Sequence, residues 1–292
     1  MANLDPFRNR QVRAQLIDEY NAVMRTWRVL FDERDISTSF GSTHVVVAGP
    51  ESAPPLVLFH GAALTAAMWG SIIAPLSGGY RCYCIDNIND ATKSVATKRV
   101  CGVTDYVVWL RETFAELGIE NARVAGLSYG GWLAALCAVH APELVNRLVL
   151  MSPAATLDRI ATKWMLRMVS ATIVPSRPFV VRALAWAAGG SDVTADPGMA
   201  MSVTSMVSSR PFRREFVRPT KLTDDELRRI SAPTTVLLGD REVIYAGGPE
   251  TALVRAEKFI PYVHARLLPA AGHILMLDAP ETVVAEMLKA FT

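Results

Sequence analysis

One serine set between glycines, where a strand passes into a helix, constrains this chain more than any other feature. The segment Gly-Leu-Ser-Tyr-Gly at 126–130 follows a short run of strand character, 123–125, and precedes a helical run rich in small residues, 132–140. A serine on so sharp a turn has a strained backbone, and its hydroxyl is pushed out above the sheet. The two flanking glycines have no Cβ, so strand and helix can approach closely. The pattern predicts a nucleophile elbow centred on Ser128.

The rest of the chain predicts strands that alternate with helices. Leu56 to Phe59 is apolar without alternation, which suits a strand buried on both faces of a parallel sheet. Further strands are expected at 81–85, 147–151, 234–238 and 265–268, and a polar loop is expected at 86–97. This order predicts an α/β fold with a mostly parallel central sheet flanked by helices, and ligands bind at the carboxyl ends of such strands.

Residues 155–230 differ from the remainder, because strand signals vanish there. Helical segments rich in Met, Trp and Ala are separated by prolines. We interpret this stretch as a helical cap inserted into a core made of residues 1–154 and 231–292. Its Met and Trp side chains either pack between cap and core or line an adaptable apolar substrate pocket. In the last helix, Asp278 with Glu281 predicts a capping box.

Composition excludes several classes of function. The 292 residues are 51% hydrophobic, enough for one large core or for a core with an insertion. The net charge of +2 is too small to argue for a nucleic acid or a membrane as partner, and no apolar run approaches the ~20 residues that span a bilayer. Residues 1–13 lack the apolar region of a secretory signal. Nothing in the sequence indicates an oligomer.

The four cysteines have no metal-ligand spacing with histidine nearby. We therefore expect buried thiols in a reducing cytoplasm, and no metal.

A serine nucleophile needs a base to take its proton and a third group to orient that base. Of the five histidines, His273 is the best candidate, because it follows a predicted strand in Ala-Gly-His at 271–273, downstream of Ser128. His60 also lies in a loop after a strand. It is followed by Gly61, the usual sign of a structural turn.

Two carboxylates after the strand at 234–238 compete for the third position. Asp240 stands at the strand end, where it could simply bond to loop amides. Glu242 lies three residues beyond Gly239 and its longer side chain could reach the histidine, so it is favoured. Asp158, after the preceding strand, is a third choice.

The oxyanion of an acyl-transfer reaction needs two preorganised donors. The amide of Tyr129, next to the serine, is one candidate. The amide of Ala62, in the loop after the strand at 56–59, is the other.

With these residues in place, the sequence resembles the α/β-hydrolase family and, within it, bacterial carboxylesterase-like members with a helical cap. The resemblance runs over nearly the whole chain. It rests on Pro-Pro-Leu-Val-Leu-Phe-His-Gly at 54–61, the elbow, the loop at 239–245 and Ala-Gly-His at 271–273. It implies the α/β-hydrolase fold, Ser128 and His273 as nucleophile and base, and Glu242 as the acid, in a position where Asp is commoner.

One loop departs from the family pattern. Where relatives usually have Asp-x-x-Gly-x-Gly-x-Ser, this chain has Asp-Asn-Ile-Asn-Asp-Ala-Thr-Lys-Ser at 86–94.

The implied reaction is hydrolysis of a carboxylic ester through an acyl-enzyme, with no cofactor. The expected substrate is a small, apolar, acyl-containing molecule. The same residues would serve a C–C bond hydrolase, a lactonase or a biosynthetic acyl-transfer enzyme, because the fold does not fix the substrate. A dehalogenase or epoxide hydrolase would carry Asp in place of Ser128. A ligand receptor that keeps the hydrolase fold without catalysis is the alternative from another class.

Overall fold

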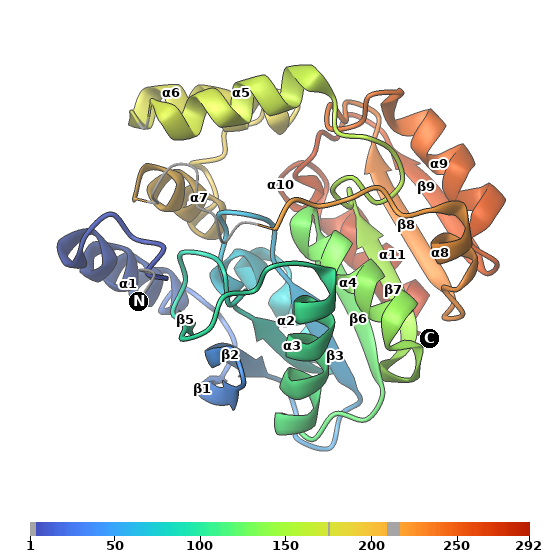
Figure 1. Cartoon of the computed structure of the whole chain (residues 1–292), viewed down its shortest axis with the longest axis horizontal. Helices are drawn as coiled ribbons and strands as arrows, with labels where there is room; N and C mark the ends of the chain where they lie inside the picture. The colour runs from blue at the N-terminus through green and yellow to red at the C-terminus, as the bar shows by residue number, and fades with distance from the viewer. Residues whose placement is uncertain (1–3, 175, 209–216) are drawn as a thin grey trace.

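The computed structural model describes residues 4–174, 176–208 and 217–292, and Figure 1 shows their arrangement. Within these ranges a single sheet has the strand order β1-β2-β4-β3-β6-β7-β8-β9, and β5 pairs with β2. The strands are β1 (Phe31–Thr38), β2 (Gly41–Ala48), β3 (Pro55–Phe59), β4 (Arg81–Ile85), β5 (Val95–Ala96), β6 (Ala122–Leu127), β7 (Val145–Met151), β8 (Thr234–Gly239) and β9 (Val263–Leu268). From β4 to β9 every neighbouring pair is parallel, whereas β2 pairs antiparallel with β1, β4 and β5. The predicted mostly parallel α/β sheet is confirmed.

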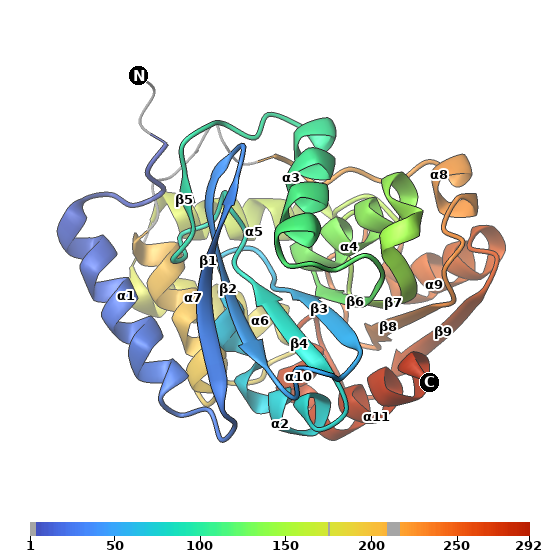
Figure 2. The same ribbon diagram turned by 90° about the horizontal axis from the view of Figure 1, so that it is seen from below.

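Helices cover both faces of this sheet. The α-helices are α1 (Arg10–Met24), α2 (Ile73–Ser77), α3 (Val103–Glu116), α4 (Tyr129–His140), α5 (Thr162–Ile173), α6 (Arg177–Ala187), α7 (Pro197–Ser208), α8 (Asp224–Arg228), α9 (Gly248–Phe259), α10 (Leu275–Asp278) and α11 (Pro280–Phe291). Two 3-10 helices, η1 (Ala66–Ser71) and η2 (Pro142–Leu144), complete the set within the described ranges. Figure 2 shows α1 and α7 on one side of the sheet and α3 and α4 on the other.

Alternation along the strands divides the interior into two cores. In β3, Leu56 and Leu58 enter the cluster with α1, α2, α7 and α11, while Val57 and Phe59 enter the cluster with α3, α4 and α9. Successive strand residues point to opposite faces, so a strand covered on both faces must be apolar throughout. Burial on both faces explains why β3 and β8 lack the alternation of apolar and polar residues.

Two local expectations were wrong. The loop predicted at 86–97 contains β5, which pairs with the start of β2. Asp278 does not cap the last helix with Glu281. The N-cap of α11 is Ala279, which makes no side-chain cap hydrogen bond. The Asp278 carboxylate instead accepts hydrogen bonds from the Ser191 hydroxyl and from the amide of Gly272, at 2.7 Å for the amide. These tertiary donors replace the local ones.

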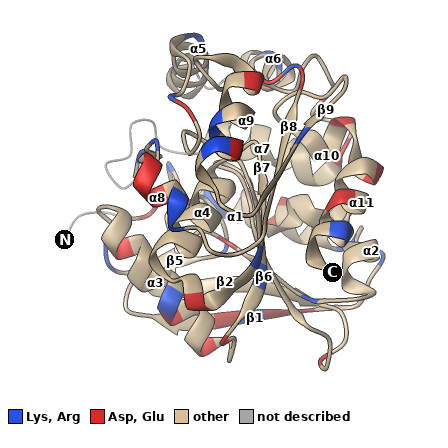
Figure 3. Cartoon of the chain, turned by 90° about the vertical axis from the view of Figure 1, so that its right-hand side faces the viewer, with Lys and Arg blue, Asp and Glu red and all other residues tan. Residues whose placement is uncertain are grey.

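The segment predicted as a cap, 155–230, supplies α5 to α8, and its residues 175 and 209–216 lie outside the described residues. Helices α5 and α6 lie at the opposite end of the molecule from β1, as Figures 1 and 3 show. Helix α7 instead packs beside α1 and η1, where a Cβ on Gly198 would stand 2.6 Å from the carbonyl oxygen of Ala67. None of the helices in the described ranges is long and apolar enough to cross a bilayer.

Candidate active site

Ser128 lies between the end of β6 and the start of α4 with a backbone conformation that few non-glycine residues adopt. Its φ is 55° and its ψ is −114°. A Cβ on Gly126 would stand 2.2 Å from the carbonyl oxygen of Gly130, and a Cβ on Gly130 would stand 2.1 Å from that of Phe59. Both glycines are therefore required by close backbone approach. The strained turn is the elbow geometry that the sequence predicts.

Three side chains form a continuous hydrogen-bonded chain at this turn. Nε2 of His273 lies 2.8 Å from Oγ of Ser128. Nδ1 of the same ring lies 2.9 Å from Oε2 and 3.1 Å from Oε1 of Glu242. The three residues are separated by 145 and 31 positions in the sequence and come from the ends of β6, β8 and β9. A hydroxyl, an imidazole and a carboxylate are thus in contact, in the order that a nucleophile, a base and an orienting acid require.

The Glu242 carboxylate is fixed and charged. It is only 5% exposed, and its Oε1 accepts hydrogen bonds from the amides of Val243 (2.8 Å) and Ile244 (2.9 Å). Burial raises the pKa of this carboxyl. Attraction to His273 and hydrogen bonds to the carboxylate outweigh burial and leave the pKa below its ordinary 4.5. An ionised carboxylate that accepts from Nδ1–H leaves Nε2 free to accept the serine proton.

The other two carboxylates weighed from the sequence lie elsewhere. Asp240 is exposed, and its amide continues the ladder of β8 by donating to the carbonyl of Leu268. Asp158 accepts a hydrogen bond from the amide of Gly247 at 2.8 Å. Of the three candidates, only Glu242 contacts His273.

His60 has a structural environment. Its Nδ1 lies 2.8 Å from the carbonyl oxygen of Gly61, and its Nε2 accepts from the amide of Asn87 at 2.9 Å. Both ring nitrogens are therefore used to hold the loop after β3 against the loop after β4. The fully buried Asp86 anchors that second loop by accepting from the amides of Ala66 and Lys93.

The two amides predicted as oxyanion donors belong to the two segments that meet at Ser128, the start of α4 and the loop after β3. Tyr129 is the first residue of α4, where backbone N–H groups point outward along the helix axis. Its buried phenol donates to the carbonyl of Val217 at 2.7 Å. The other donor, Ala62, follows Gly61, whose Cβ would lie 3.5 Å from Cβ of Ser128. The loop after β3 thus runs directly beside the nucleophile.

The loop that carries His273 is held by the end of α6 and the residues that follow it. The amide of His273 donates to the carbonyl of Ala187 at 3.0 Å, and a Cβ on Gly272 would stand 2.4 Å from the amide nitrogen of Gly189. Asp278 ties the same loop to Ser191. The contact of Asp278 with Ser191 and Gly272 was not predicted. The only available signal was a carboxylate five residues after the histidine, which also matched a helix cap.

Trp164 of α5 is a second residue that the sequence left undecided. Its ring lies edge-on to the imidazole of His273, with centroids 4.6 Å apart, and 6.1 Å from the ring of Trp186. By contrast Met199, Met201 and other insertion residues are buried in the core. These methionines therefore pack in the core, whereas Trp164 contacts the imidazole of His273.

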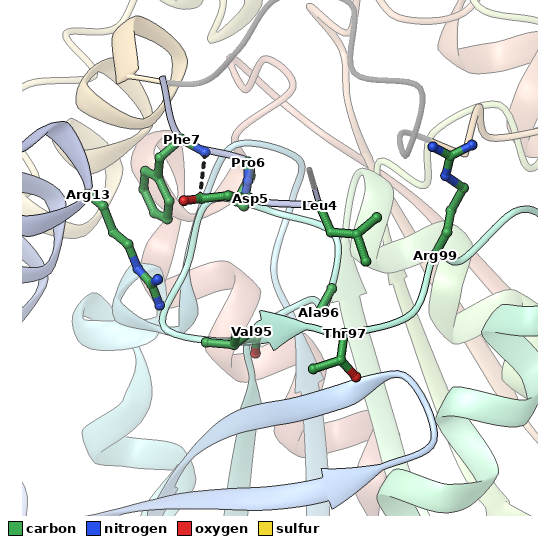
Figure 4. A pocket seen from close by; sticks show the side chains of 10 residues that line it. Leu4, Asp5, Pro6, Phe7, Arg13, Val95, Ala96, Thr97 and Arg99 are labelled. Atoms are coloured by element: carbon green, nitrogen blue, oxygen red, sulfur yellow. Dashed lines mark hydrogen bonds between the residues drawn. The ribbon is translucent and has the colours of Figure 1, made fainter. Parts of the chain in front are cut away.

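A separate hollow of about 830 Å³ lies between the N-terminal segment and β5 (Figure 4). Residues 4–7, Arg13, 94–97 and Arg99 line it. None of them belongs to the hydrogen-bonded chain at Ser128.

Comparison with known proteins gives consistent results. A family model described as "Alpha/beta hydrolase family" matches residues 56–286. The uncharacterized carboxylesterase nap of Bacillus subtilis (strain 168) is 35% identical over 280 residues, covering 93% of this chain and 90% of that protein. Carboxylesterase YbfK of the same strain is 31% identical, covering 90% and 89%. The crystal structure of naproxen esterase from Bacillus subtilis superposes with a TM-score of 0.86 at 34% identity, covering 96% of this chain and 98% of the other.

Proposed function

The chain belongs to the alpha/beta hydrolase family and is an ester-hydrolysing enzyme, and we propose that Ser128, His273 and Glu242 are its catalytic triad. The observation that carries the proposal is the unbroken chain of hydrogen bonds from Glu242 through the imidazole to a serine on a strained turn. A residue with a purely structural role rarely combines a strained backbone, a hydrogen bond to an imidazole and a carboxylate on the other side of that ring.

In the proposed reaction, Oγ of Ser128 attacks the ester carbonyl while Nε2 of His273 accepts its proton. Glu242 stabilises the imidazolium and keeps the second proton on Nδ1. The imidazolium then gives its proton to the leaving alcohol, which leaves an acyl-enzyme. Water attacks this ester by the same route and releases the acid, so that no proton is gained or lost over the cycle.

We propose the amides of Tyr129 and Ala62 as donors to the oxyanion. Tyr129 directly follows Ser128, and Ala62 follows Gly61, whose Cβ would lie 3.5 Å from that of Ser128; these positions support the assignment. Removal of one such donor typically lowers turnover by about 10²–10³. Residues 155–230 are proposed as the cap. The Trp164 ring beside His273 supports a small apolar substrate, because an acyl or alcohol group that reaches the serine would lie against it.

Cys82, Cys84 and Cys137 are buried as expected, whereas the expectation is wrong for Cys101, which is exposed. None of the four forms a disulfide, which supports a reducing location, and we propose the cytoplasm.

Fluorophosphonate labelling with peptide mapping tests the nucleophile. The wild type should be labelled at Ser128 and should hydrolyse p-nitrophenyl acetate. Ser128→Ala should lose both while keeping its melting temperature. His273→Ala should be inactive, whereas His264→Ala, at an exposed histidine of β9, is the matched control. A folded wild type that neither labels nor turns over esters would contradict the proposal and would favour a ligand receptor.

A further inference from the structure

An exposed apolar stripe runs along the outer face of α5. Leu166, Val169 and Ile173 recur at helical spacing and are 68%, 40% and 52% exposed. Trp164 and Ala171 lie on the opposite face, which is turned toward the site and the core. We refer to the first three residues as the α5 stripe.

The α5 stripe is part of a concentration of exposed apolar side chains. Within the described residues, six of the eleven large apolar side chains that are exposed lie between 165 and 179. Single exposed apolar residues are ordinary, but a contiguous group marks an interaction surface. This group belongs to one helix and to the start of the next.

The same helices carry a strong positive charge. Residues 162–187 contain four basic residues and no Asp or Glu, although the whole chain has a net charge of only +2. Arg177 and Arg182 of α6 are exposed, and Lys163 and Arg167 of α5 stack on the Trp186 ring at 5.6 and 4.7 Å. Since α5 and α6 pack together, these four basic residues lie on the same pair of helices as the α5 stripe.

The apolar and basic residues of α5 and α6 together indicate which partner would bind this surface. A second copy docked through a two-fold axis would bring the same four cations together without a counter-charge, which is unfavourable at a desolvated interface. An exposed apolar stripe on a pair of helices that carries Lys and Arg but no acidic residue matches instead an anionic lipid surface, into which amphipathic helices insert their apolar face. Docking in this way needs no membrane span.

We propose that α5 and α6 dock the enzyme onto anionic lipid surfaces through the α5 stripe and the basic residues of the two helices. The inner face of α5 holds Trp164 against His273, so docking brings the site within about one helix diameter, ~10 Å, of the lipid. The docking surface and the proposed triad are independent of each other. Neither the net charge of +2 nor the apolar runs of the chain predict such a surface, because its cations and apolar residues are concentrated on two helices.

Vesicle sedimentation tests the proposal. Wild type should bind phosphatidylglycerol vesicles, should bind phosphatidylcholine vesicles much more weakly, and should be released by salt. The double variant Leu166→Gln/Ile173→Gln should bind at least about tenfold more weakly, because two apolar side chains no longer insert. Arg177→Gln/Arg182→Gln should weaken binding to phosphatidylglycerol and reduce its salt dependence.

The matched control is Leu30→Gln/Val254→Gln, which changes two exposed apolar residues outside α5 and α6 and should bind as wild type. Turnover of water-soluble p-nitrophenyl acetate should be unchanged in all three variants, which separates docking from catalysis. Absence of wild-type binding to phosphatidylglycerol would overturn the proposal. So would equal loss in the Leu30 and Val254 control. Light scattering that shows a dimer dissociated by Leu166→Gln/Ile173→Gln would overturn it in favour of a second copy.

Discussion

Replacing Glu242 by Gln tests whether the carboxylate acts by fixing the histidine tautomer. Oε1 of Glu242 accepts two backbone N–H groups, from Val243 and Ile244. A glutamine must place its carbonyl oxygen there, because its NH₂ group would face two donors. The NH₂ group then takes the position of Oε2, which lies 2.9 Å from Nδ1 of His273. This NH₂ group is closer to Nδ1 than the carbonyl oxygen at the Oε1 position, 2.9 Å against 3.1 Å, and it can only donate. We therefore expect Nδ1 to accept from it and the ring proton to move to Nε2.

The magnitude follows from that geometry. A histidine protonated at Nε2 donates toward Ser128 and cannot take its proton. In triads of this kind the amide substitution lowers turnover by about 10⁴, or ~5.4 kcal/mol of transition-state stabilisation. Glu242→Ala removes the carboxylate without forcing the wrong tautomer. Its loss should therefore be smaller than that of the glutamine variant, although the side chain is shorter.

Burst-free turnover of p-nitrophenyl acetate at saturating ester gives kcat for wild type, Glu242→Gln and Glu242→Ala. Asp240→Asn is the matched control, because that carboxylate is exposed and lies outside the triad, and its kcat should stay within about twofold of wild type. A glutamine variant as active as the alanine variant would refute the tautomer argument. An Asp240→Asn variant with the larger loss would transfer the acid role to Asp240.

Three further predictions concern the elbow, the thiols and pH. Gly130→Ala should lose at least about 3 kcal/mol of folding free energy in urea unfolding, because its Cβ would stand 2.1 Å from a β3 carbonyl oxygen, whereas Gly79→Ala, with open space around its Cβ, should be near neutral. Iodoacetamide at pH 7 should modify exposed Cys101 first in native protein, since burial raises the pKa of Cys82 to about 12; mapped label on Cys82 at an equal rate would contradict this. The pKa of Glu242 is lowered on folding, so the contribution of its carboxylate to stability is fully present above pH 4.5 and is lost as pH falls through the folded pKa. In urea unfolding, the stability of wild type relative to Glu242→Gln should therefore fall as pH is lowered below 4.5, and a relative stability that rises there would contradict this.

The sheet and the sharp turn at Ser128 could be predicted because local sequence determines them. The apolar runs of β3 and β8 match strands buried on both faces, and the glycines beside Ser128 are demanded by carbonyl oxygens little more than 2 Å from their missing Cβ atoms. The spacing from Gly239 to Glu242 is also local. The Glu242 amide donates to the Gly239 carbonyl in a turn, and this turn directs the Glu242 side chain inward. The amide of Asp240 instead pairs with β9, and its carboxylate is exposed.

The parts that sequence analysis missed depend on contacts between distant segments. Nothing near Trp164 in the chain indicates that its ring meets His273, which lies 109 positions later. The orientation of α5 was equally hidden, because the apolar residues of both its faces look alike in the sequence. A stripe that would normally mark a buried face is here left exposed, with Leu166 at 68%.

Asp278 shows why a correct local pattern can still give a wrong structure. An Asp three residues before a Glu suits a helix start, where a cap contributes about 1 kcal/mol. In the fold, the same carboxylate can reach the Gly272 amide and the Ser191 hydroxyl, and both donors are part-buried. Leaving such donors unpaired costs about 1–3 kcal/mol of folding free energy each, which is more than an exposed helix cap contributes. The carboxylate therefore joins the insertion to the residue that precedes His273, and the position of the base depends on a contact that no helix-capping rule describes.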